Sequence, residues 1–245
     1  MKTAIIIPSR MSSKRFPNKP MAKINGIPMI ERVWKQGIKS KIGDVYVACS
    51  EDEVFNLISS KGGKAIMTDP NLPSGTDRVF AAFNLLDNKD EYESIINLQG
   101  DMPLIDSINI QSVNIPLENG YDIGTIATEI SNEEEKNENI TKVSIDWKEA
   151  DVVGNSLDFY KFPTKQSSNI YQHVGIYSFK PIALRKFVSL PPSKNEIDRK
   201  LEQLRAIDAG IKIGITYVEN VPISVDTLED LILIENILNN RDENK

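Results

Sequence analysis

Hydrophobic and polar positions follow two different periods along the first half of the chain. Short apolar runs, typical of buried strands, are separated by stretches in which apolar residues recur every three or four positions, as in amphipathic helices. The predicted strands are residues 4–7, 45–48, 65–67, 94–98 and 123–130, and the predicted helices are 29–40, 52–60, 76–86 and, weakly, 106–117. Successive strand–helix units of this length predict an α/β fold with a mostly parallel, doubly wound sheet.

The pattern changes after residue 130. An acidic, polar stretch at 131–139 is followed by strand-like signals up to residue 179. We interpret 131–179 as a small antiparallel insertion that forms dimer contacts or covers a substrate, set into an α/β domain of residues 1–130 and 180–245. That domain is completed by helices at 181–188 and 196–209, a strand at 211–218 and a closing helix at 228–239.

Composition narrows the classes of function. The 245 residues have a net charge of −6, which argues against a general nucleic-acid or membrane-surface binder. No apolar run approaches the ~20 residues of a membrane span and none resembles a signal peptide, so we expect a cytoplasmic protein. One His and one Cys cannot form a zinc cluster, so any metal should be a hard, oxygen-bound cation.

The loop after the first strand is strongly basic. Pro8 ends the strand, and the loop then contains Arg10, Lys14, Arg15 and Lys19. Open α/β sheets bind ligands at the carboxyl ends of their strands, and several separate cations suit a polyphosphate. The alternative is a solvated basic surface loop. The chain has neither a Walker motif nor G-x-G-x-x-G, so side-chain charge must do most of the phosphate binding.

Two carboxylates follow strand-like segments. Asp101 comes after the strand at 94–98, where Gly100 allows a tight turn, and Asp226 precedes the last helix. Asp226 can be read as a helix N-cap or, together with Asp101, as a ligand of Mg²⁺, which needs only one or two carboxylates besides waters and phosphates.

Other polar groups have a structural and a functional interpretation. In the run Ser74–Arg78, Ser74 or Thr76 is either a helix cap or part of an anion site that includes Arg78. The lone His173 on a strand is either structural or catalytic. Residues 202–205 fall inside a predicted helix and read as a solvated face, and Cys49 as a small buried residue.

Six fragments in order resemble one known family. They are I-I-P-S-R-x-x-S-K-R-x-P-x-K-P at 6–20, S-G-T-D-R at 74–78, N-L-Q-G-D-x-P at 97–103, Q-H-V-G-I-Y at 172–177, L-E-Q-L-R at 201–205 and V-D-T-x-E-D-L at 225–231. This set resembles the CMP-Kdo synthetases (3-deoxy-manno-octulosonate cytidylyltransferases) over nearly the whole chain. The resemblance implies a nucleotide-diphospho-sugar transferase-like fold, a homodimer and a Mg²⁺-dependent reaction. CTP and the sugar acid Kdo would give CMP-Kdo and pyrophosphate for lipopolysaccharide synthesis.

The resemblance also implies roles for individual residues. Arg10, Arg15 and Lys19 match triphosphate ligands and, with Asp101, the catalytic set. Ser9, Ser74 and Gly75 match the cytosine and ribose pocket, and Asp101 and Asp226 match the metal ligands. The positions that match the surroundings of the sugar acid are Arg78, Gln99, Lys161, His173, Tyr177, Glu202 and Gln203.

The chain departs from the family pattern at three places. Asn18 stands where the family commonly has Gly, and Ser50 where it commonly has Asp. Around residues 157–163 the family usually has Tyr-Phe-Ser-Arg, and Lys161 stands in for that Arg, which leaves open a cytidylyltransferase for a related acid, such as 8-amino-Kdo or a sialic-type sugar.

Two other classes of protein are alternatives to a cytidylyltransferase. A glycosyltransferase would be expected to have an Asp-x-Asp pair, and this chain contains none. A non-catalytic nucleotide-binding homologue would most simply have lost Asp101 or Asp226, and both are present.

Overall fold

The computed structural model describes residues 1–12, 16–147, 152–163, 169–221 and 223–242. The chain divides into two compact units. The first unit comprises Lys2–Glu91, Asn97–Ile108 and Pro222–Lys245, and the second comprises Met1, Tyr92–Ile96 and Asn109–Val221.

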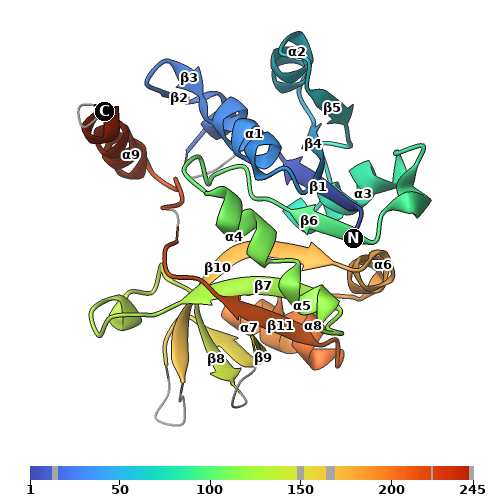
Figure 1. Ribbon diagram of the computed structural model, residues 1–245, viewed down its shortest axis with the longest axis vertical. Coiled ribbons are helices and arrows are strands. Elements are labelled where there is room, and N and C mark those ends of the chain that lie inside the picture. Colours follow the sequence, from blue (N-terminus) through green and yellow to red (C-terminus); the bar gives the residue numbers. More distant parts are fainter. Residues whose placement is uncertain (13–15, 148–151, 164–168, 222, 243–245) are drawn as a thin grey trace. The chain divides into compact units, whose positions relative to one another are not determined.

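The first unit contains the parallel strands that the sequence predicts. β1 (Thr3–Pro8) pairs with β4 (Gly43–Cys49), which pairs with β5 (Lys64–Met67), all in parallel. α1 (Met29–Ser40), α2 (Asp52–Ser60) and α3 (Gly75–Asn84) connect or follow these strands (Figure 1). The side chains of residues 4–7 are fully buried, because β1 is covered on both faces.

Short elements of the first unit carry too few residues for a periodic signal. They are η1 (Lys19–Met21), the hairpin of β2 (Lys23–Ile24) and β3 (Ile27–Pro28), and η2 (Lys89–Glu91). Asn25 (φ 46°) and Gly26 (φ 75°) form the turn of the hairpin, and both adopt the left-handed conformation that Asn-Gly pairs favour.

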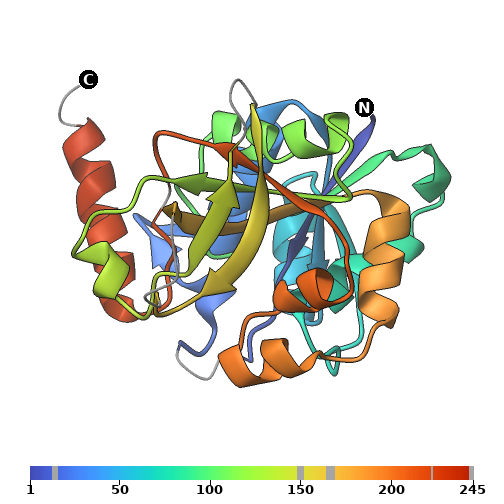
Figure 2. The same cartoon turned by 90° about the horizontal axis from the view of Figure 1, so that it is seen from below.

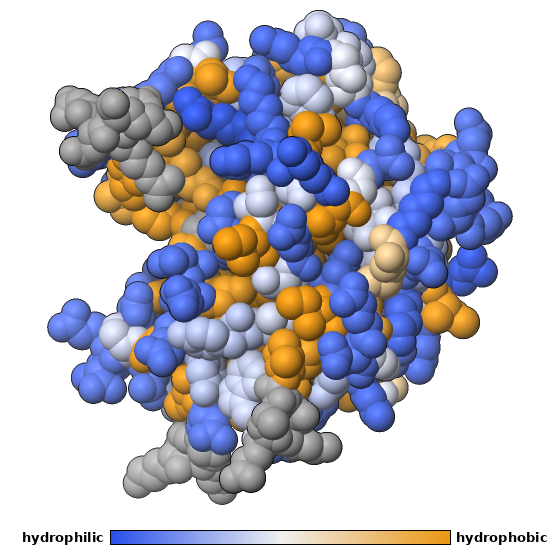
Figure 3. Space-filling model, in the orientation of Figure 1, coloured by the Kyte–Doolittle hydropathy of each residue, from blue (hydrophilic) through white to orange (hydrophobic). Residues whose placement is uncertain are grey.

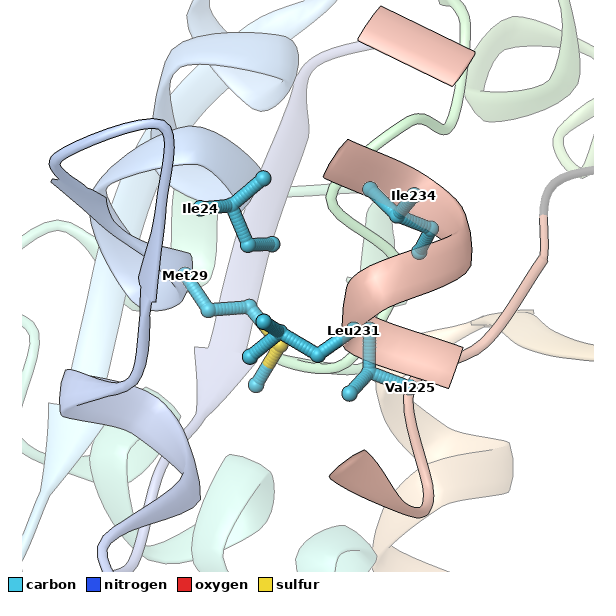
Figure 4. Close-up of a cluster of buried hydrophobic side chains, with 5 residues drawn as sticks. All are labelled: Ile24, Met29, Val225, Leu231 and Ile234. Atoms are coloured by element: carbon cyan, nitrogen blue, oxygen red, sulfur yellow. The ribbon is translucent and has the colours of Figure 1, made fainter. Parts of the chain in front are cut away.

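The last helix packs on the N-terminal part of the first unit. α9 (Leu228–Asp242) contributes Leu231 and Ile234 to a buried cluster with Ile24, Met29 and Val225 (Figure 4). The cluster joins segments about 200 residues apart, so it determines where the chain around Asp226 lies.

The second unit contains a mixed sheet. β7 (Ile123–Thr128) is parallel to β11 (Ile213–Tyr217) and antiparallel to β10 (Ile170–Phe179), while β8 (Lys142–Asp146) and β9 (Val153–Tyr160) pair antiparallel with each other (Figure 2). β8 also pairs with β10, and β9 with β11, both antiparallel. The α/β class is confirmed, but the description "mostly parallel" holds only for the first unit. Only residues 161–169 separate β9 from β10, which is too short for the crossover of a dozen or more residues that parallel strands require.

The helices of the second half are shorter than predicted. The helix expected at 106–117 is divided into α4 (Ser107–Ser112) and α5 (Ile115–Glu118), which has Pro116 in its first turn. The helix expected at 196–209 is divided into α7 (Lys194–Arg199) and α8 (Leu204–Asp208), because Lys200 adopts a left-handed φ of 56°. The remaining elements are β6 (Ser94–Asn97), η3 (Glu134–Lys136) and α6 (Pro181–Ser189).

Three further expectations from the sequence concern the domain division, Cys49 and membrane-spanning helices. The division into 1–130 with 180–245 and an insertion at 131–179, with its dimer or cover role, stays a prediction. Cys49 is buried, as expected. Across the described ranges, no helix combines the length and apolar character needed to cross a bilayer.

Candidate active site

A cavity of about 500 Å³ lies in the first unit, at the carboxyl end of β1. Of the residues that the structure describes, fourteen line it, and they come from four separate parts of the chain: Pro8, Ser9, Arg10, Ser12, Lys19, Pro20, Met29, Ser74, Gly75, Arg78, Gln99, Gly100, Asp101 and Asp226. Nine of the predicted site residues are among them, so the structure brings most of the predicted nucleotide set together.

The loop after β1 is anchored at both of its described ends. The Ser9 N–H donates to the Ala48 carbonyl (2.8 Å), and the Asn18 N–H donates to the Met11 carbonyl (3.1 Å). Asn18 adopts a left-handed φ of 57°, which explains why Asn can stand where the family commonly has Gly. Arg15 and Lys14 lie outside the described residues, so the role of Arg15 stays a prediction.

Two buried polar atoms of the cavity residues lack a hydrogen-bond partner within the described part of the chain. They are the Ser9 hydroxyl oxygen and Arg78 Nη2, on side chains that are 4% and 2% exposed. The other Arg78 amino nitrogen, Nη1, donates to Thr68 Oγ1. Burial lowers the pKa of Arg78 from its ordinary value, while the charge of Glu51 opposes this shift. Such groups are costly to bury unless a ligand satisfies them.

The N-terminus of α3 forms one wall of the cavity. Ser74 is the N-cap residue, since its hydroxyl oxygen accepts from the Asp77 N–H (3.1 Å) and its hydroxyl donates to Asp77 Oδ2 (2.7 Å). The capping interpretation of Ser74 is therefore correct, and Ser74 also lines the cavity. Exposed N–H groups at the start of a helix favour an anionic ligand.

The segment after β6 approaches the end of β1 closely. A Cβ on Gly100 would lie 3.0 Å from the Pro8 carbonyl oxygen, so a larger residue would displace the backbone. Gln99 Nε2 donates to Asn97 Oδ1 (2.8 Å), and Asn97 in turn reaches Thr76 Oγ1 (3.4 Å). This chain of hydrogen bonds orients Gln99 in the cavity wall.

Lys19 joins the two predicted metal ligands. Its Nζ lies 2.8 Å from Asp101 Oδ2 and 3.3 Å from Asp226 Oδ1. The Val225 N–H donates to the Asp101 carbonyl (2.9 Å), which holds the two segments side by side. Asp226 is not the cap of α9, because Thr227 Oγ1 accepts from the Asp230 N–H instead.

The two carboxylates suit a hard divalent cation. Both Asp101 and Asp226 line the cavity, and oxygen is the ligand that Mg²⁺ prefers. Among the described residues no group of three or more His, Cys, Asp or Glu side chains could enclose a metal. A cation here would need further ligands from water or from phosphate oxygens, as Mg²⁺ sites commonly have.

The predicted sugar-acid residues are divided between the two units. Arg78 and Gln99 line the cavity of the first unit. His173 and Tyr177, on β10, belong to the second unit, with ring centroids 5.4 Å apart. Glu202 and Gln203 belong there too, but they precede α8 and do not lie inside a helix, which corrects that expectation.

Burial dominates the ionisation of this aromatic pair. It lowers the pKa of His173 from 6.5 to about 3. It also raises the pKa of Tyr177 above its ordinary value, and the charge of Glu202 adds to the increase. Both side chains are neutral at neutral pH, and an imidazole with so low a pKa is a weak general base.

The segment 157–163, which departs from the family pattern, forms hydrogen bonds with β8 and with α7. Arg199 Nη1 donates to both carboxylate oxygens of Asp158 (2.7 and 2.8 Å), and the Tyr160 and Ser144 hydroxyls are 2.9 Å apart. The buried Lys142 donates from Nζ to the Lys161 carbonyl (2.8 Å). These contacts fix the backbone at Lys161, whose role toward the sugar acid stays a prediction.

Comparison with known proteins identifies the family. The family model described as "Cytidylyltransferase" matches residues 4–213. The 3-deoxy-manno-octulosonate cytidylyltransferase of Paramagnetospirillum magneticum is 44% identical over 93% of this chain and 94% of its own length. The 3-deoxy-manno-octulosonate cytidylyltransferase of Rickettsia rickettsii is 44% identical over 93% of this chain and 93% of its own length. The chain belongs to the 3-deoxy-manno-octulosonate cytidylyltransferase family.

Solved structures agree with this family assignment. A CMP:2-keto-3-deoxy-manno-octonic acid synthetase complexed with CTP has 29% identity and a TM-score of 0.89, covering 98% of this chain and 100% of the other. A UDP-glucose pyrophosphorylase has 15% identity and a TM-score of 0.69, covering 99% and 100%, and shows a shared fold only.

Sequence reasoning missed several residues of the cavity wall in this family member. Ser12, Pro20 and Met29 carry no charged group, and no site role was predicted for them, although Pro20 ends the family fragment at 6–20. Met29 could have been inferred from its place at the start of a helix directly after the basic loop. Ser12 offered no signal that separates it from ordinary loop residues.

Proposed function

We propose that this protein is a 3-deoxy-manno-octulosonate cytidylyltransferase. It transfers CMP from CTP to the anomeric hydroxyl of Kdo and releases pyrophosphate. The observation that carries the proposal is the group formed by Lys19, Asp101 and Asp226 in the wall of the cavity. The ammonium group of this lysine and the carboxylates of the two aspartates lie beside the end of β1. Open α/β sheets bind nucleotides at this end of their strands.

The cavity of the first unit binds CTP in this proposal. Arg10 and Lys19, with Arg15, neutralise the triphosphate and stabilise the pyrophosphate that leaves. Ser9 and Arg78 offer the buried Oγ and Nη2 that have no partner within the described ranges, and a polar nucleotide satisfies them. Ser74 and Gly75 add the N-terminus of α3.

Asp101 and Asp226 would hold Mg²⁺. When bound, the ion neutralises phosphate charge and lowers the pKa of a coordinated hydroxyl. Lys19 lies between the two carboxylates and offsets their mutual repulsion. The protein's part in the reaction is thus charge neutralisation and alignment of two anionic substrates, without a covalent intermediate.

For the sugar acid we propose the set that the sequence predicts. Its members are Arg78, Gln99, Lys161, His173, Tyr177, Glu202 and Gln203. His173 and Tyr177 are neutral, so they bind hydroxyl groups rather than the carboxylate of the sugar acid. We also propose a cytoplasmic homodimer, a state to be checked by light scattering of the purified chain.

Release of pyrophosphate tests the function. Purified protein receives CTP, Mg²⁺ and, in separate reactions, Kdo, 8-amino-Kdo and a sialic acid. We expect release with Kdo. Release only with another acid would assign that acid as substrate, as the departures around Lys161 allow. Binding of CTP without release from any acid would contradict the enzyme and support a nucleotide-binding homologue.

A further inference from the structure

The hydroxyl of Thr125 contacts three groups in the buried part of the second unit. Thr125 lies on β7 and is fully buried. Its Oγ1 is 2.8 Å from the Ile176 carbonyl, 3.1 Å from the Val174 carbonyl and 3.1 Å from His173 Nε2. The β7–β10 ladder is irregular between Val174 and Tyr177, so both carbonyls lie at a bulge of β10.

A hydroxyl has one proton, and two of these three neighbours can only accept it. The proton of Thr125 therefore goes to a carbonyl, with Ile176 the nearer, and a lone pair of Oγ1 faces the imidazole. A hydrogen bond at Nε2 then requires that Nε2 carry the ring proton. The reverse arrangement would take the Thr125 proton away from two buried carbonyls, which is costly.

We infer that Thr125 is a positioning residue that fixes His173 in the Nε2–H tautomer, so that Nδ1 is a hydrogen-bond acceptor for a hydroxyl group of the sugar acid. No described residue donates a hydrogen bond to Nδ1. The His173 N–H donates to the Thr141 carbonyl (2.9 Å), which holds the backbone in place.

The surroundings of the ring strengthen this arrangement. Phe159 contacts it edge-on at 5.1 Å between centroids, and Tyr177 lies 5.4 Å away. Burial alone keeps the imidazole neutral, with its pKa lowered to about 3, so Nδ1 is not protonated at neutral pH. An acceptor in such apolar surroundings binds a hydroxyl strongly and cannot form an ion pair with a carboxylate.

Because His173 is the only histidine, nitrogen NMR of the whole protein can measure its tautomer directly. Wild-type protein labelled with ¹⁵N-histidine should give one protonated nitrogen at Nε2 and one unprotonated nitrogen at Nδ1 at neutral pH. Thr125→Ser should keep this spectrum, and Thr125→Val should populate the Nδ1–H form. A wild-type ring protonated at Nδ1, or an unchanged tautomer in Thr125→Val, would overturn the inference.

Kinetics separate positioning from a merely structural role. Thr125→Val should raise the KM for Kdo about tenfold and leave the KM for CTP unchanged. Thr125→Ser, which keeps the hydroxyl, should have the wild-type KM for Kdo. Thr128→Val is the matched control, because Thr128 is a buried threonine of the same strand whose hydroxyl donates to the Glu219 backbone carbonyl instead (3.3 Å). A loss of thermal stability in Thr125→Val with both KM values unchanged would contradict the positioning role.

The substrate part of the inference rests on the proposed function and has its own readout. Adding Kdo to the labelled protein should shift the Nδ1 resonance while Nε2 stays protonated. An unshifted Nδ1 in a protein that turns over Kdo would overturn the contact but leave the function standing. Absence of turnover with any sugar acid, with the tautomer as expected, would contradict the function and leave the role of Thr125 in place.

Discussion

Ser9 offers the clearest test at the scale of single residues. The hydroxyl of Ser9 is buried and has no partner within the described ranges, so its removal costs the folded protein little. We expect Ser9→Ala to melt at the wild-type temperature or slightly above it, but to bind CTP about tenfold more weakly. Thermal unfolding and calorimetric titration with CTP measure the two effects.

Ser40→Ala is the matched control for Ser9→Ala. Ser40 is also buried, but its hydroxyl donates to the Gly37 carbonyl (2.6 Å). This variant should lose about 1 kcal/mol of unfolding free energy and bind CTP normally. A drop in stability for Ser9→Ala with normal CTP affinity would contradict a ligand role for Ser9.

Asp101 and Asp226 are tested by removing one charge at a time. Asp101→Asn and Asp226→Asn should each lower the turnover number by about 100-fold or more, because several kcal/mol of charge stabilisation in the transition state is lost. Folding should persist, since both groups are partly exposed at the cavity. Steady-state kinetics and circular dichroism measure turnover and folding.

Asp44→Asn controls for loss of an ordinary aspartate–lysine pair. Asp44 pairs with Lys64 at 2.7 Å on the surface of the same unit. Its loss should leave turnover unchanged and cost at most about 1 kcal/mol of stability. Near-normal turnover in Asp101→Asn or Asp226→Asn would remove that carboxylate from the proposed metal site.

At the scale of elements, α9 connects stability with the position of Asp226. Its buried residues pack against Ile24 and Met29, and Met29 also lines the cavity (Figure 4). Its outer face exposes Leu228, Ile232 and Leu233, where apolar surface is visible over the helix at the upper left of Figure 3. The mixture of buried and exposed apolar residues explains why the helix shows little amphipathic bias.

Two isoleucines of α9 provide a matched pair. Ile234 is fully buried, whereas Ile232 is 49% exposed. Ile234→Ala should lower the unfolding free energy by about 2–5 kcal/mol and weaken turnover, because the packing that positions Asp226 is loosened. Ile232→Ala should change the unfolding free energy and the turnover number little. Urea unfolding measures the first quantity and steady-state kinetics the second. Equal losses of stability and turnover in both variants would contradict the proposal that the packing of Ile234 positions Asp226.

The elements themselves were predictable where their periodicity was long enough. The structure confirms α1 and α2 at their predicted bounds because 9 to 12 residues display a full helical pattern. The hairpin of β2 and β3 was missed because strands of two residues have no period. Lys200 was read as helical, but it is the C-cap residue of α7 with a left-handed φ of 56°, which ends the helix there.

At the scale of the whole molecule, the single histidine links pH to stability. His173 has a pKa of about 3 in the folded protein and an ordinary value of 6.5 when unfolded. Between these values only the unfolded chain binds the proton, so stability falls as pH falls below 6.5, by about 1.4 kcal/mol per pH unit. His173→Gln should show a shallower decline in urea unfolding between pH 6.5 and pH 4.5. An identical slope would contradict a buried neutral imidazole.

The sequence by itself determined the strand–helix order, the basic loop after β1 and the types of residue in the candidate site. These features follow from local hydrophobic periodicity and from side-chain chemistry, which are properties of neighbouring residues. Motif order also determined the family, which the relatives confirm. Asp101 and Asp226 were predicted to be metal ligands from residue type and motif order, without knowledge of their distance, and that role stays a prediction.

Only the tertiary structure decided which of these groups meet. Lys19 Nζ lies between Asp101 and Asp226, which are 82 and 207 residues away in the chain. Arg78 and Gln99 line the cavity of the first unit, while the rest of their predicted set belongs to the second. Thr125 was not noticed at all, because its neighbour His173 is 48 residues away. Contacts of this kind arise from strand pairing and packing between distant segments, which local sequence patterns do not encode.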